Sequence, residues 1–216
     1  MMKAILFDMD GLMVDTERLY IETESELARS YGKELQEETI FKMMGKKPTE
    51  AMEVFIRDLE LEVPANDLLQ IRDGMFEERL RKDLVPMAGL FEMLGEYKNT
   101  LKMGIATGSA RKFAEMILTQ LKIDEFFSVI CTSNEVANGK PDPEIYLKVM
   151  EKLGVLPEEC IVLEDSRNGA LAGKKAGCYT IAVPSEYTCG LDFSFVDYEA
   201  TDLHDARMHI REKFFG

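Results

Sequence analysis

Short apolar runs rich in β-branched and aromatic residues recur along the chain, and each is followed by a segment of helical periodicity. The runs are continuous rather than alternating, which is typical of strands covered on both faces. Helices between consecutive runs favour parallel pairing, because parallel strands need a long crossover connection. The pattern therefore predicts an α/β fold with a doubly wound parallel sheet. The five predicted strands are 3–7, 102–106, 127–131, 160–163 and 179–183, and a late strand is expected near 200–203.

A long interval separates the first two predicted strands and contains only helical patterns. Apolar and charged residues alternate there near the helical period, with no strand-like run between them. We therefore expect a small all-α domain at 16–82, inserted after the first strand, and an α/β core formed by 1–15 and 83–216. The alternative is one irregular domain with all these helices flat on the sheet, but a small sheet offers too little room. The predicted helices of the insert are 17–31, 37–44, 49–59 and 65–82.

The chain is acidic: 26 Lys and Arg residues against 40 Asp and Glu residues give a formal net charge of −14. Without an excess of cations, neither nucleic acid nor an anionic membrane is an expected partner. No apolar run approaches the length of a spanning helix, and the first residues lead into a strand rather than a signal peptide. The four cysteines form no C-x-x-C pair, which favours reduced thiols. We expect a soluble, cytoplasmic, monomeric protein.

Several common chemistries are excluded by inspection. Residues 1–203 contain no histidine, and we expect His204 and His209 to lie on the surface near the C-terminal end. A Ser-His-Asp triad or an imidazole-rich metal site would need one of them to fold back onto the sheet. The G-x-x-x-x-G-K-[ST] and G-x-G-x-x-G phosphate-binding motifs are also missing from the sequence. Carboxylate chemistry remains.

Carboxylates follow two of the predicted strands. Asp8 and Asp10 end the first strand, where residues two apart face the same side, and Glu164 and Asp165 end the fourth. If these ends are neighbours, each like-charge contact at about 4 Å costs on the order of 4 kcal/mol at an effective dielectric of about 20. Such a cluster needs a cation, and ligands that are all oxygen favour Mg²⁺ first and Mn²⁺ next. A calcium-binding loop does not fit, because apolar residues stand at two of its ligand positions.

Two further segments carry groups that bind anions. Thr107, Gly108 and Ser109 follow the second strand, where hydroxyls and backbone N–H groups at a helix start favour phosphate oxygens. Lys140 lies just before another helical pattern. Taken alone, the triplet is as often a simple helix cap, and the lysine is more often a solvated loop residue. Four polar clusters after apolar runs of one sheet, taken together, predict a single site.

These motifs, in this order, resemble those of the haloacid dehalogenase superfamily of phosphohydrolases over nearly the whole chain. The helical insert is similar to the cap of the subgroup that includes β-phosphoglucomutase and sugar-phosphate phosphatases. The resemblance implies a Rossmann-like core with a helical cap and phosphoric monoester hydrolase activity on a small phosphorylated metabolite, such as a sugar phosphate. The matching motifs are D-x-D-G-x-x-x-D-T at 8–16, the hydroxyl of Thr107, Lys140 and the pair Glu164-Asp165.

The resemblance also implies roles for the matching residues. Asp8 would attack phosphorus and form an aspartyl-phosphate, and Asp10 would act as general acid and base. Mg²⁺ would be held by Asp8, the backbone carbonyl of Asp10 and Asp165, with Glu164 assisting directly or through water. The non-bridging phosphate oxygens would be held by Thr107 and Lys140, which would also restrain Asp8. An aspartate at the position of Asp10 is typical of phosphatases and mutases rather than dehalogenases.

Residues of the predicted cap bear on the choice between hydrolysis and phosphoryl transfer. The mutase branch usually has a histidine where this chain has Tyr20 and an arginine after the cap glycine, where this chain has Lys46. Hydrolysis is therefore expected, and a phosphosugar mutase stays as the alternative. A receiver domain that carries phospho-aspartate, or another binding module, is the non-enzymatic alternative, disfavoured by Asp10 and the insert. Further candidates for phosphate or substrate contact are Thr16, Tyr20, Gly45, Lys46, Gly108 and Ser109.

Overall fold

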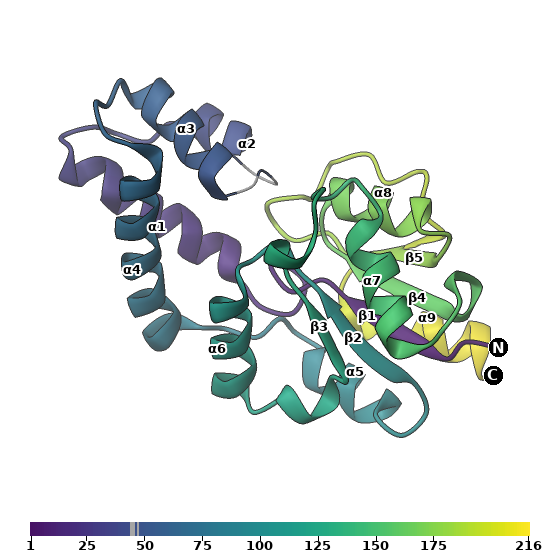
Figure 1. Cartoon of the computed structure of the whole chain (residues 1–216). Helices are drawn as coiled ribbons and strands as arrows, with labels where there is room; N and C mark the ends of the chain where they lie inside the picture. Colours follow the sequence, from purple (N-terminus) through teal and green to yellow (C-terminus); the bar gives the residue numbers. More distant parts are fainter. Residues whose placement is uncertain (44–45, 47) are drawn as a thin grey trace. The chain divides into compact units, whose positions relative to one another are not determined.

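The protein is described from a computed structural model, which covers residues 1–43, 46 and 48–216 in describable detail. A six-stranded parallel sheet with the strand order β3-β2-β1-β4-β5-β6 forms the centre of the first compact unit, residues 1–15 and 85–216 (Figure 1). The chain winds outward from β1 to β3 and returns on the other side of β1, so its direction reverses between β1 and β4. The predicted doubly wound α/β fold is confirmed. The strands are β1 Ala4–Phe7, β2 Lys102–Ala106, β3 Val129–Cys131, β4 Cys160–Glu164, β5 Tyr179–Ala182 and β6 Tyr198–Glu199.

The register of the central strands brings their carboxyl ends level with one another. Phe7, the last residue of β1, lies opposite Ile105 of β2 on one side and Leu163 of β4 on the other. All four residues of β1 are buried, because helices cover both faces of the sheet. The residues that follow these three positions therefore leave the apolar sheet at one edge, next to the reversal of winding, where ligands bind in open α/β folds.

The helices of the first unit lie on both faces of this sheet. Residues of α7 and α8 form one core cluster with apolar residues of β1, β2 and β4, so both helices cover the same face. Helices α5 and α9 pack together behind the sheet in Figure 1, on the opposite face. For α5, which connects β1 to β2, a right-handed crossover requires this face once the winding direction reverses for α7 and α8. The helix bounds are α5 Leu90–Tyr97, α6 Arg111–Leu121, α7 Glu144–Leu153, α8 Arg167–Lys175 and α9 Leu203–Phe214, with short η1 Asp124–Phe126, η2 Ser133–Glu135 and η3 Pro157–Glu159.

The C-terminal part of this unit differs from the sequence prediction. The late strand expected near 200–203 is present but lies earlier, as β6 at Tyr198–Glu199, and α9, which was not predicted, begins at Leu203. Asp202 starts this helix because its side chain accepts a hydrogen bond from the Asp205 backbone N–H at 2.8 Å. The third predicted strand is also shorter, since η1 occupies the residues just before it.

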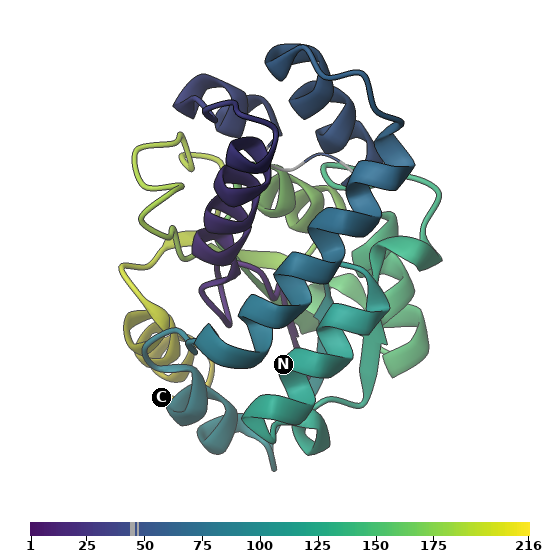
Figure 2. The same ribbon diagram turned by 90° about the vertical axis from the view of Figure 1, so that its left-hand side faces the viewer.

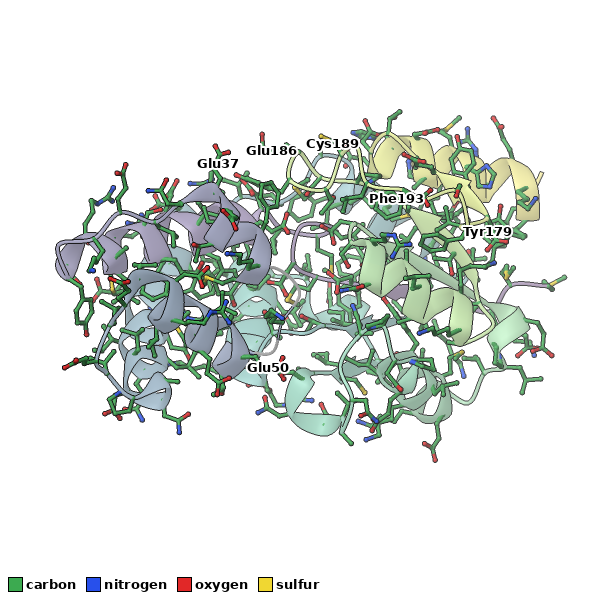
Figure 3. The ribbon with its side chains drawn as sticks, turned by 90° about the horizontal axis from the view of Figure 1, so that it is seen from above. Glu37, Glu50, Tyr179, Glu186, Cys189 and Phe193 are labelled. Atoms are coloured by element: carbon green, nitrogen blue, oxygen red, sulfur yellow. The ribbon has the colours of Figure 1, made fainter. Side chains whose placement is uncertain are left out.

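Three of the C-terminal elements, β5, β6 and α9, are joined by an aromatic cluster. His209 of α9 is half-buried rather than on the open surface, and its ring stacks on Tyr198 with centroids 3.7 Å apart. Its Nε2 lies 2.9 Å from the hydroxyl of Tyr179 at the start of β5, which is labelled in Figure 3. In the loop between β5 and β6, Phe193 packs against Ala170 and Ala182. The histidine therefore has a packing role here.

The second compact unit, residues 16–84, contains helices and no strand among its described residues. Amphipathic helices bury their apolar stripes against each other, with Phe55 and Met52 of α3 fully buried in the middle. Helices α1 and α4 pack against each other along their lengths (Figure 2). Among the described residues of the chain, no helix is long and apolar enough to cross a membrane. The helices are α1 Thr16–Ser30, α2 Glu37–Met43, α3 Pro48–Leu59 and α4 Ala65–Asp83.

A buried pair of charged side chains, Glu24 and Arg72, lies between α1 and α4 beside an aromatic stack. The ring of Tyr20 stacks on Phe76 with centroids 3.9 Å apart, and the guanidinium of Arg72 lies 5.1 Å from the same ring. Glu24 is buried beside Arg72, with a carboxylate oxygen 3.9 Å from a guanidinium nitrogen. Burial raises the pKa of Glu24 to about 7, and the nearby positive charge of Arg72 offsets this only in part.

The chain leaves the sheet unit and returns to it at neighbouring points. The backbone N–H of Asp15 donates to the carbonyl of Val85 at 3.0 Å, and that of Met87 donates to the carbonyl of Met13 at 2.9 Å. Val14 and Pro86 form an antiparallel bridge between these bonds. The two connecting segments therefore run side by side.

Candidate active site

Carboxylates from the ends of β1 and β4 meet where the winding of the sheet reverses. One side-chain oxygen each of Asp8, Glu164 and Asp165 lies within 4.8 Å of the others, and all three residues are buried. The backbone N–H of Asp8 donates to the carbonyl of Leu163 at 3.0 Å, which continues the β1–β4 pairing one residue beyond the strand. The structure thus brings together carboxyl groups more than 150 positions apart in the sequence.

Lys140 lies between two of these carboxylates. Its Nζ is 2.5 Å from Asp8 Oδ1, 2.5 Å from Glu164 Oε1 and 2.9 Å from the carbonyl oxygen of Ala106. An ammonium group has three protons, so each can go to one of these acceptors. Burial disfavours the charged lysine, but the attraction of Asp8 and Glu164 outweighs it, and the pKa of Lys140 is raised.

Asp8 lies in an environment that disfavours its charge. Burial is the largest cause of a pKa well above the ordinary value, the charges of Glu164 and Asp10 raise it further, and Lys140 opposes the shift. One ammonium group therefore does not balance this cluster. A divalent cation would favour the ionised forms of these acids, and their carboxylate oxygens are the ligands that hard cations such as Mg²⁺ prefer. The donor set fits the metal expected from the sequence.

Glu164 is held from several sides and has no solvent exposure. Its Oε1 accepts a hydrogen bond from the hydroxyl of Tyr146 at 2.7 Å as well as from Lys140. Its Oε2 accepts from the backbone N–H of Ser166 at 3.2 Å and from the Ser166 hydroxyl at 3.0 Å. A Cβ atom on Gly169 would lie 1.7 Å from Glu164 Oε1, so only glycine leaves space for this carboxylate.

Sequence reasoning missed Tyr146 and Gly169. Tyr146 occupies a buried position of the amphipathic helix α7, where the pattern predicts a core aromatic residue and nothing in it marks the hydroxyl. Gly169 lies within α8, where a glycine signals only a weaker helix former. Both contacts depend on tertiary structure.

The second strand end contributes hydroxyl groups. The Thr107 side chain donates to Asp10 Oδ2 at 2.8 Å, and the backbone N–H of Ser109 donates to the Thr107 hydroxyl at 2.9 Å. Thr107 and Ser109 are buried, Asp10 is half-buried, and Gly108 between the hydroxyls is exposed. Gly11 follows with a φ of +79°, which a residue with a side chain rarely adopts, and so permits the turn after Asp10.

The remaining predicted contacts belong to the helical unit. Thr16 is fully buried at the start of α1, and Lys46 is exposed. Tyr20 is half-buried in its stack with Phe76. Gly45 lies outside the described residues. The contacts of these four residues with a substrate stay predictions.

The chain is similar to known proteins over most of its length. Residues 5–183 match the model of the haloacid dehalogenase-like hydrolase family. A phosphorylated carbohydrates phosphatase from Thermotoga maritima is 37% identical over 180 residues, which cover 82% of each protein. A mutant CbbY from Rhodobacter sphaeroides, solved in complex with xylulose-(1,5)-bisphosphate, has a TM-score of 0.86 at 26% identity, covering 94% of this chain and 95% of that one. A β-phosphoglucomutase from Clostridium difficile shares the fold, with a TM-score of 0.84 at 22% identity over 98% of this chain and 96% of that one.

Proposed function

Because the chain belongs to the haloacid dehalogenase-like hydrolase family and is one of its phosphatases, we propose that it hydrolyses small phosphomonoesters. We propose that the reaction uses Mg²⁺ and proceeds through an aspartyl-phosphate on Asp8. The observation that carries the proposal is the position of Asp8, buried beside Lys140 and the acidic pair at the point where the sheet winding reverses. A cytoplasmic location and a monomeric state belong to the same proposal.

Asp8 and Asp10 divide the proposed chemistry between them. An oxygen of Asp8 attacks phosphorus, the bond from phosphorus to the leaving oxygen breaks, and Asp10 gives that oxygen a proton. Asp10 then takes a proton from water, whose oxygen attacks the phosphorus of the aspartyl-phosphate and releases inorganic phosphate and free Asp8. The hydrogen bond from Thr107 to Asp10 Oδ2 supports this role, because it fixes the carboxyl that must both give and take the proton.

Charge compensation is assigned to a metal and to Lys140. When bound, Mg²⁺ would neutralise charge between the Asp8 nucleophile and the phosphoryl group, held by Asp8, Asp165 and the backbone carbonyl of Asp10. Lys140 holds Asp8. We propose that, on substrate binding, Lys140 exchanges its hydrogen bond to the Ala106 carbonyl, and Thr107 its bond to Asp10, for a bond to a non-bridging phosphate oxygen. Glu164 already accepts hydrogen bonds at both oxygens, so we assign it to Lys140 rather than to direct contact with the metal.

Phosphorylated sugars are the proposed substrate class. Support comes from the similarity to the Thermotoga maritima phosphatase and from the sugar bisphosphate bound to the mutant CbbY. The fold shared with a β-phosphoglucomutase keeps phosphoryl transfer between sugar positions as the alternative. Tyr20 and Lys46 favour hydrolysis, because the mutase branch usually has a histidine and an arginine at these positions.

The test is phosphate release from a panel of sugar phosphates, nucleotides and phosphoglycolate, with Mg²⁺ and with EDTA. We expect Mg²⁺-dependent release that Asp8→Asn abolishes, while Asp192→Asn, a change of an exposed aspartate in the β5–β6 loop, has no effect. Asp10→Asn should slow breakdown of the intermediate, so that intact mass spectrometry detects one added phosphoryl group. Release by Asp8→Asn at the parent rate would overturn the proposal, and interconversion of β-glucose 1-phosphate and glucose 6-phosphate faster than hydrolysis would favour the mutase.

A further inference from the structure

The carboxylate of Glu164 has its acceptor sites filled by donors of the chain itself. Lys140 and Tyr146 donate to Oε1, and the backbone and hydroxyl of Ser166 donate to Oε2. An ionised carboxylate offers about four acceptor sites, so this group is fixed in one orientation. The oxygen that faces Lys140 depends on a single neutral donor, the hydroxyl of Tyr146.

Tyr146 contacts both members of the Lys140–Glu164 ion pair. Its hydroxyl lies 2.7 Å from Glu164 Oε1, and the centre of its ring lies 5.1 Å from Lys140 Nζ, within the range of a cation–π contact. The residue is fully buried in α7. Burial, followed by the charge of Glu164, raises the pKa of its hydroxyl well above the ordinary value, so the group stays a donor.

We propose that Tyr146 is a positioning residue: by fixing Glu164, it sets the place of Lys140 Nζ beside the nucleophile Asp8. The inference rests on the proposed function, in which Lys140 binds a phosphate oxygen. The ammonium lies between Asp8 Oδ1 and Glu164 Oε1, so a rotation of Glu164 would draw it away from Asp8. Such a displacement weakens a contact that the transition state needs at a defined position.

The backbone of Gly169 also approaches the same carboxylate closely. A Cβ atom there would lie 1.7 Å from Glu164 Oε1 and 2.2 Å from Oε2. Gly169 has no left-handed backbone conformation that would require glycine, and alanine is a better helix former. The Tyr146 hydroxyl and the Gly169 backbone therefore both restrict this carboxylate, and each can be altered separately.

The first test is Tyr146→Phe, which keeps the ring and removes only the hydroxyl. We expect kcat on the best sugar phosphate to fall about tenfold, as is usual when the partner that orients an active-site group is lost, with KM within about twofold of the parent. The matched control is Tyr97→Phe, because that hydroxyl also donates a hydrogen bond, to the carbonyl of Arg207 at 2.9 Å, but not to a site residue. Its kcat should not change.

The second test needs no activity. In the substrate-free protein, the ¹⁵N-detected ammonium signal of Lys140, assigned by its loss in Lys140→Arg, should shift in Tyr146→Phe and exchange its protons with water faster. Tyr97→Phe should leave the signal as it is. Gly169→Ala, which displaces Glu164 without removing a hydrogen bond from helix α8, should give the same shift and a similar loss of kcat.

The outcomes separate this inference from the proposed function. An unchanged Lys140 signal in Tyr146→Phe, or a kcat within about twofold of the parent while Asp8→Asn is inactive, overturns the positioning role alone. An equal loss of kcat in Tyr97→Phe also overturns it. Phosphate release that is insensitive to Asp8→Asn overturns the proposed function, and with it the inference.

Discussion

At the scale of single residues, one lysine forms ion pairs with two buried carboxylates. Lys140 lies 2.5 Å from both Asp8 and Glu164, and its side chain is 13% exposed. Removing one partner of a buried ion pair leaves an uncompensated charge, so Lys140→Met should lower the free energy of unfolding by about 3 kcal/mol in EDTA. Urea unfolding measures this. Lys175→Met, which removes an exposed hydrogen bond to the carbonyl of Pro141, should cost less than about 1 kcal/mol, and equal losses would contradict the argument.

Glu24 should make the stability of the helical unit depend on pH. Its pKa is raised from 4.5 to about 7 in the folded chain, so between these values the unfolded chain binds fewer protons than the folded one. Stability from this group is therefore present at low pH and lost as the pH rises from about 4.5 to about 7. Urea unfolding of the parent and of Glu24→Gln at pH 5 and pH 8 measures the difference. The variant should lose about 1–3 kcal/mol less than the parent over this interval. Parallel pH profiles of the two proteins would show that Glu24 does not titrate there.

At the scale of elements, the close approach of α7 to β2 explains a glycine in a strand. A Cβ atom on Gly104 would lie 2.5 Å from Val149 Cγ1 and 3.2 Å from Leu153 Cδ1, both on α7. Gly104→Ala should therefore destabilise the protein by about 1–3 kcal/mol through overpacking. Gly74→Ala in α4, where a Cβ atom meets nothing within 4 Å, should instead stabilise it by about 0.5–1 kcal/mol. Thermal unfolding tests the opposite signs, and a loss in both variants would contradict them.

The elements also show what the sequence could predict. The strand ends at Asp8, Thr107 and Glu164 were predictable because buried parallel strands are continuous apolar runs, and the first polar residue marks where each run stops. The role of Tyr146 was not predictable, since its hydroxyl gains a hydrogen-bond partner only when α7 packs across the end of β4. The late strand was placed wrongly because β6 comprises only two residues and pairs on one side alone, which leaves no hydrophobic pattern to recognise.

At the scale of the whole molecule, the acidic cluster should link metal binding to folding. An ion that binds only the folded chain stabilises it by about 2.7 kcal/mol at 100 times its dissociation constant. We expect Mg²⁺ to raise the midpoint of thermal unfolding in the parent but not in Asp165→Asn. Sodium chloride at matched ionic strength is the control, because a net charge of −14 is also screened by salt. An equal gain from both salts would place the effect on general screening rather than on the site.

The two connecting segments, which run side by side at Val14 and Pro86, have a consequence for exchanging the helical unit between related proteins. The helical unit is inserted into the chain between two adjacent backbone positions. A segment from another protein whose ends have a similar spacing could therefore replace it without altering any strand of the sheet. The proposed substrate contacts of Tyr20 and Lys46 would be exchanged with that segment, while Asp8, Lys140 and Glu164 stay in place on the sheet unit. A chimaera that carries the corresponding segment of a relative tests whether substrate preference moves with it.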